Sequence, residues 1–149
     1  MIFAALLALL YTRDASHELT SFKDCGSTAG TIQNVTVEPC SNPSDCELKK
    51  GTSPKIKIAF TPNSLTTQLK AVVHGIVKGI PVPFPLPNPD ACKDSGITCP
   101  LSAKVPAVYE QAFEIKKSYP SIGLLIRWEL RNEQDKDVVC FVSHVHIVE

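Results

Sequence analysis

Six cysteines carry the most distinctive chemistry of this 149-residue chain. They are Cys25, Cys40, Cys46, Cys92, Cys99 and Cys140. An even number of cysteines in an exported chain indicates a disulfide framework, and six allow 15 pairings. Cys40 with Cys46 and Cys92 with Cys99 enclose few residues, so loop closure favours two local rings. That leaves Cys25 to pair with Cys140, which joins the two ends of the domain.

Histidines offer the other possible chemistries, metal binding and acid–base catalysis. His144 and His146 share a strand face, but the apolar alternation along residues 138–148 turns both outward. Without a Cys-x-x-Cys motif a zinc site is disfavoured. His74 could act as a general base, yet no nucleophile stands beside it in the sequence. No catalytic motif is present either, so we expect no enzyme activity, no catalytic residue, no metal and no cofactor.

The first residues have the pattern of an export signal. The apolar run at 2–11, IFAALLALLY, is too short to cross a bilayer and lies where a signal peptide has its hydrophobic region. We interpret 1–16 as a signal peptide cleaved after Ser16 and 17–149 as the mature domain; a retained anchor helix is the alternative. In an exported chain the sequon Asn34-Val35-Thr36 predicts an N-linked glycan on Asn34.

Charge and length limit the possible partners. The chain has 15 basic and 15 acidic residues, and removing 1–16 takes one of each sign. Binding to nucleic acid needs an excess of Lys and Arg on one face, so nucleic acid is not an expected partner. The length suits one domain.

Alternation of apolar and polar residues predicts an all-β protein. Residues 122–130 and 55–60 are the clearest half-buried strands. Further strands are expected at 30–37, 70–78, 104–109, 113–119 and 138–148, and residues 132–137 form a polar hairpin turn. About seven short strands with this spacing describe an antiparallel β-sandwich of immunoglobulin type.

A proline-rich segment departs from this pattern. Residues 81–89, PVPFPLPNP, have proline at every second position, which we expect to prevent regular ladder pairing and to favour a stiff extended segment. A ligand for an aromatic groove is one interpretation. We prefer a rigid wall whose Val82, Phe84 and Leu86 side chains point inward.

Three stretches together resemble the soluble sterol carriers of the ML lipid-recognition domain family. They are KAVVHGIVKGIPVPFPLPNP at 70–89, FKDCG at 22–26, and YPSI at 119–122 before WEL at 128–130. The resemblance runs from Phe22 to Val148. It implies an immunoglobulin-like sandwich with an apolar tunnel between its sheets and the same three disulfides that the spacing favours.

The resemblance also implies which residues line the tunnel. Carried over position by position, they are Val37, Leu48, Val82, Phe84, Ile115, Tyr119, Pro120, Leu124, Trp128 and Phe141. Mammalian members have Trp at position 141 and Val at position 115, so the cavity here would differ in volume while staying apolar.

The function implied is that of a secreted and lysosomal sterol carrier. It would bind unesterified cholesterol as a monomer, touch anionic late-endosomal or lysosomal membranes, and pass the sterol to the large polytopic Niemann-Pick type C membrane protein for export. A carrier or co-receptor for another lipid, such as a glycolipid, phospholipid or fatty acid, is the main alternative. A structural sandwich without a cavity is another.

Overall fold

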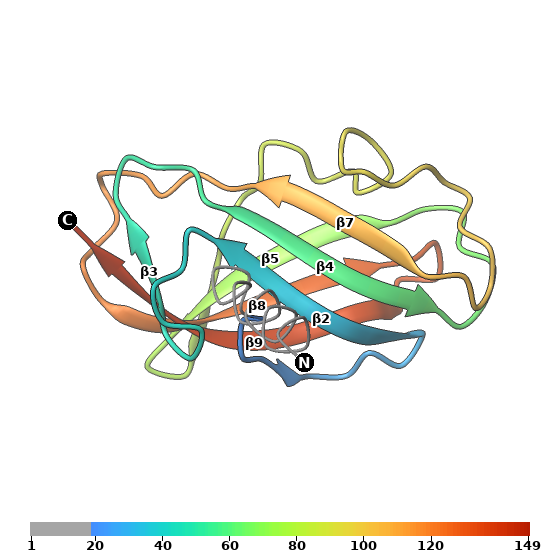
Figure 1. Cartoon of the computed structure of the whole chain (residues 1–149), viewed down its shortest axis with the longest axis horizontal. Helices are drawn as coiled ribbons and strands as arrows, with labels where there is room; N and C mark the ends of the chain where they lie inside the picture. Colours follow the sequence, from blue (N-terminus) through green and yellow to red (C-terminus); the bar gives the residue numbers. More distant parts are fainter. Residues whose placement is uncertain (1–18) are drawn as a thin grey trace, which may run out of the picture.

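The computed structural model describes residues 19–149, which form a β-sandwich (Figure 1). The predicted signal peptide lies outside the described residues. The strands are β1 (Lys23–Asp24), β2 (Gly30–Glu38), β3 (Cys46–Lys49), β4 (Lys55–Pro62), β5 (Lys70–Val77), β6 (Ile80–Pro83), β7 (Ala107–Ala112), β8 (Gly123–Arg131) and β9 (Asp137–Val148). No helix occurs among these residues, so the predicted all-β class is confirmed.

Two sheets make the sandwich. The larger has the order β1-β9-β8-β5-β6, with β3 also paired to β9, and the smaller has the order β2-β4-β7. Figure 1 shows β2, β4 and β7 lying across β5, β8 and β9. Within the described chain every strand pairing is antiparallel except that of β3 with β9.

The core lies between the sheets and follows the predicted alternation. Ile56, Ile58 and Phe60 of β4 are fully buried, as are Trp128 and Leu130 of β8. Burying each such side chain contributes about 1.5–3 kcal/mol to folding. The sequence pattern therefore identified the inward faces of β4 and β8 correctly.

The three expected disulfides are present. Cys25 is bonded to Cys140, Cys40 to Cys46, and Cys92 to Cys99. The first bond fixes the end of β1 to β9, beside the backbone hydrogen bond from Cys25 N to Cys140 O at 2.9 Å.

The strand predicted at 113–119 is wrong. Phe113 and Ile115 are buried and alternate with exposed neighbours, but the chain leaves the smaller sheet after Ala112. Its backbone bonds instead to the loop before β4, with Ile115 N donating to Thr52 O at 2.9 Å. Burial alternates here without a strand, because an extended loop lies across an apolar surface.

The start of β7 also differs from the prediction. The strand begins at Ala107 instead of residue 104, because Lys104 has a φ of 64° and Val105 N closes a turn onto Ser102 O. β1 and β3 were not predicted, since two to four residues carry too little alternation.

The expectation that the prolines prevent ladder pairing is wrong for β6. Ile80–Pro83 pairs with His74–Val77 of β5 through a two-residue turn in which Lys78 and Gly79 both have positive φ. Phe84 N donates a hydrogen bond to Val73 O at 2.9 Å. In an antiparallel ladder the backbone N–H groups alternate in direction along a strand, so the even-numbered residues of this segment are the ones that donate to β5. Proline occupies the odd positions, whose nitrogens face away from the sheet, and no ladder bond is lost.

Candidate functional site

An apolar cavity of about 510 Å³ lies at one end of the sandwich. At this end the chain has left strand β7, which stops at Ala112, and the segment that follows β7 lines the cavity. Its floor is the inner face of the larger sheet. One row across that floor is Val82 on β6, Gly75 on β5 and Ile126 on β8, which are register neighbours. A second row pairs Leu124 of β8 with Val145 of β9.

The facing wall is formed by loops. Ile115, Tyr119 and Pro120 lie on the segment that follows β7, and Phe84 follows β6. Phe84 and Tyr119 are partly buried and their ring centroids are 5.6 Å apart. The mouth is therefore bounded by two aromatic rings held on separate loops.

Aromatic contacts continue from the mouth into the core. Phe84 packs edge-on to Phe113 at 6.2 Å, Phe113 to Trp128 at 5.7 Å, and Trp128 to Tyr109 at 6.1 Å between ring centroids. Burial raises the pKa of Tyr109 to about 12, and its hydroxyl accepts a hydrogen bond from Gln111 Nε2. A continuous row of aromatic contacts thus links Phe84, which lines the cavity, to the core.

Seven of the ten predicted lining residues do line this cavity. They are Leu48, Val82, Phe84, Ile115, Tyr119, Pro120 and Leu124. Val37, Trp128 and Phe141 do not; each is buried in the core. Contact with a ligand stays a prediction at all ten positions.

Several lining residues were not predicted. They are Gly75, Val77, Pro83, Pro85, Lys116, Ile122, Ile126, Val145 and Ile147. Alternation had already placed Ile122, Ile126, Val145 and Ile147 on inward faces, but alternation does not distinguish a cavity wall from a filled core. Nothing in the sequence pattern indicated that Gly75 or Lys116 lines a cavity.

The rim of the cavity combines exposed apolar side chains with lysines. Ile80 is 65% exposed and Val82 is 49% exposed, both on β6. Lys116 is the charged residue among the lining side chains, and Lys78 and Lys117 are exposed close by in sequence. Exposed apolar side chains and lysines thus occur together on and beside the cavity lining.

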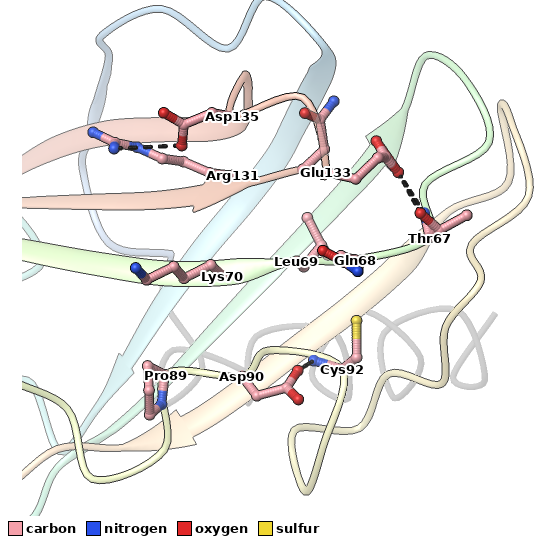
Figure 2. A pocket seen from close by; sticks show the side chains of 11 residues that line it. Thr67, Gln68, Leu69, Lys70, Pro89, Asp90, Cys92, Arg131, Glu133 and Asp135 are labelled. Atoms are coloured by element: carbon pink, nitrogen blue, oxygen red, sulfur yellow. Dashed lines mark hydrogen bonds and ion pairs between the residues drawn. The ribbon is translucent and has the colours of Figure 1, made fainter.

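A second, polar groove of about 590 Å³ lies at the start of β5 and the β8–β9 turn (Figure 2). Most of its charged groups already have a partner within the chain. Glu133 accepts hydrogen bonds from the Thr67 backbone N at 2.6 Å and hydroxyl at 2.9 Å, and Arg131 lies 3.6 Å from Asp135. Polar groups that contact water and already have hydrogen-bond or ion-pair partners within the chain do not require a ligand. The apolar cavity is therefore the stronger candidate.

The three histidines among residues 19–149 face away from the cavity. His144 and His146 are exposed on the outer face of β9, as predicted. His74 lies on the outer face of β5, where its Nδ1 is 3.4 Å from Arg127 Nη2.

One group of three potential metal ligands occurs among residues 19–149. It consists of Glu129, Asp137 and Cys140, with ligand atoms within 4.8 Å of one another. The sulfur of Cys140 is bonded to Cys25 and is not available as a thiolate ligand.

Asn34, the predicted glycan site, is half-buried in β2 next to a β-bulge.

Within that group of three potential metal ligands, Glu129 affects the protonation of Asp137. Burial and the nearby Glu129 raise the pKa of Asp137 to about 6, although Arg131 opposes this shift. Glu129 is buried and pairs with Arg131 Nη2 at 2.6 Å and Arg127 Nε at 3.2 Å. The outer face of β8 therefore carries a compact charge network, separated from the cavity by the sheet.

Comparison with known proteins places this chain in one family. The ML domain matches residues 20–147. The chain is 42% identical to "NPC intracellular cholesterol transporter 2" of Bos taurus over 143 residues, covering 96% of this chain and 95% of that protein.

Solved structures show the same fold. A Niemann-Pick type C2 protein from Japanese carpenter ant superposes with a TM-score of 0.81 at 34% identity, covering 86% of this chain and 99% of the other. Chicken MD-1 complexed with lipid IVa has a TM-score of 0.53 at 19% identity, covering 83% and 86%, and shares the fold alone.

Residues 19–149 contain no helix with the length and apolar character that a bilayer span requires. The matched domain, the near-complete coverage of a relative at 42% identity, and the sandwich with its three disulfides agree. The chain belongs to the ML domain family.

Proposed function

We propose that this chain is a non-enzymatic sterol carrier that works in the secretory pathway and the lysosomal lumen. The observation that carries the proposal is the apolar cavity between the larger sheet and the 113–122 loop. Its volume of about 510 Å³ falls within the range of about 300–1,000 Å³ that is usual for small-molecule sites. The relatives named for cholesterol transport support the choice of sterol.

The cavity chemistry fits a sterol because a sterol is almost entirely apolar. Its rings and tail would gain about 25 cal/mol for each Å² removed from water, and its single hydroxyl needs few partners. The hydroxyl would stay at the mouth near Phe84 and Tyr119, where water can hydrogen-bond to it, while the rings and tail contact the apolar lining.

The rim fits delivery of the ligand. Exposed Ile80 and Val82 beside Lys78 and Lys116 would contact an anionic late-endosomal or lysosomal membrane, where apolar and cationic side chains both bind favourably. We propose that the same rim meets the large polytopic Niemann-Pick type C membrane protein, so that the sterol passes between sites without crossing water.

Titrating the purified protein with a fluorescent sterol at about pH 5 and about pH 7 tests the proposal directly. We expect saturable binding with one site per chain. Absence of saturable binding at both pH values would overturn the sterol assignment. Native mass spectrometry of the bound lipid separates a sterol from a glycolipid, phospholipid or fatty acid.

Variants of the mouth sharpen this test. Phe84→Ala and Tyr119→Ser each remove part of the ring pair, and losing roughly 1.5–3 kcal/mol of apolar contact weakens binding at least about tenfold. Val108→Ala is the matched control, because Val108 is exposed on β7 and does not line the cavity. Normal sterol transfer by both mouth variants, with unchanged thermal unfolding, would contradict the assignment of the site.

A further inference from the structure

A glycine lies in the middle of the cavity floor. Gly75 is buried in β5, between Val82 of β6 and Ile126 of β8. Glycine weakens the interior of a strand, so its presence there needs a reason. Backbone conformation is not the reason, because the glycines with positive φ are Gly26, Gly51, Gly79 and Gly96.

The reason is space on the cavity side. A Cβ at position 75 would lie 2.9 Å from Leu124 Cδ1, well inside the contact distance of about 3.5–4.0 Å between carbon atoms. The Leu124 side chain would have to move, and Leu124 itself lines the cavity. A methyl group at position 75 would therefore reduce the cavity by its own volume and also shift Leu124, a second lining residue.

We propose that Gly75, with Leu124 beside it, sets the cross-section of the cavity and is the residue that admits a rigid fused-ring lipid. The proposal rests on the sterol-carrier function proposed above. A fused-ring body has no rotatable bonds with which to pass an added methyl group. A single acyl chain can rotate around it, so the two lipid classes should respond differently to a change at this position.

Gly75→Ala tests the proposal when two probes are compared, a fluorescent sterol and a fluorescent conjugated fatty acid. We expect the dissociation constant for the sterol to rise at least about tenfold and that for the fatty acid to change less than about threefold. Gly123→Ala is the matched control: it lies on β8, outside the cavity, and its Cβ would have no neighbour closer than 3.8 Å. This control should bind both probes as the wild type does.

A second variant separates cavity width from folding. In Gly75→Ala/Leu124→Ala the displaced side chain is gone, so sterol binding should recover at least partly. Unchanged sterol binding by Gly75→Ala, equal weakening of both probes, or no recovery in the double variant would each overturn the role of Gly75. Failure of the wild type to bind the sterol would instead overturn the proposed function itself.

Discussion

At the residue scale, the cavity and the charge network use opposite faces of β8. Leu124 and Ile126 point into the cavity, whereas Arg127 and Glu129 take part in ion pairs on the outer face. Substitutions on one face should therefore leave the properties of the other unchanged, because the sheet lies between them.

Asp137 makes the stability of the fold depend on pH. Its pKa is raised from 3.8 to about 6 by burial and by Glu129. Between these two values the folded state binds a proton that the unfolded state has lost. The stabilising contribution is therefore complete at low pH and is lost as the pH rises through about 6.

Asp137→Asn should remove this dependence. The amide is neutral at every pH, so the variant should gain stability on the order of 1 kcal/mol relative to the wild type at about pH 8, after allowing for the partial exposure of Asp137, and almost none at about pH 4. Urea unfolding across this pH range measures the difference. Asp135→Asn is the control, since Asp135 is 80% exposed; a constant difference at all pH values would contradict the role of Asp137.

At the element scale, the longest-range covalent link is the Cys25–Cys140 bond. It spans 115 residues, whereas Cys92–Cys99 spans 7. In the chain-entropy treatment a loop of the first size contributes about 4.8 kcal/mol and one of the second size about 2.4 kcal/mol.

Replacing both cysteines of each bond by serine should therefore have unequal effects. Cys25→Ser/Cys140→Ser should lower the melting temperature more than Cys92→Ser/Cys99→Ser does, and Cys25→Ser alone should prevent secretion. Calorimetry and the amount of protein in the culture medium measure these effects. Equal melting temperatures for the two double variants would show that β1 is not held mainly by its disulfide.

The elements also show what the sequence could predict. Strands β4 and β8 were predictable because one face of each packs on the core, which produces strict alternation. The 113–119 segment has the same alternation because Phe113 and Ile115 are buried, yet hydrogen-bond partners decide whether a segment is a strand, and those partners lie more than 50 residues away.

Only part of the candidate site could be predicted from the sequence. Alternation gives the direction of a side chain but not the distance to the opposite wall. Trp128 and Leu124 share one face of β8, yet Trp128 contacts Tyr109 and Phe113 while Leu124 borders open space. That difference arises because β7 ends at Ala112 and the smaller sheet no longer covers the end of β8.

At the scale of the whole molecule, the net charge is formally zero at pH 7 and depends on the pH of the surroundings. The chain has 15 basic and 15 acidic residues and four histidines. Because the two signs balance at pH 7, each proton that the chain takes up as the pH falls makes its net charge more positive. If the proposed membrane contact occurs at the cavity rim, Lys78, Lys116 and Lys117 would add to this charge there.

Vesicle binding tests this expectation. Purified protein should sediment with phosphatidylcholine vesicles that contain an anionic phospholipid at about pH 5, and much less at about pH 7 or at high salt. The double variant Lys78→Gln/Lys117→Gln should weaken vesicle binding about fivefold for each lysine removed. Lys104→Gln is the control and should not weaken it, because Lys104 lies next to Pro62 at the end of β4 and does not line the cavity. Equal binding to neutral vesicles would show that charge plays no part.

The alternate prolines of β6 have one more consequence, which concerns aggregation. β6 is an edge strand of the larger sheet, and an edge with free N–H groups can template the addition of another chain. Pro81 and Pro83 occupy the positions whose nitrogens face outward, so this edge has no donors there to offer. Ile80 and Val82 are thus exposed on a strand whose outer edge offers a second copy no N–H donor at positions 81 and 83.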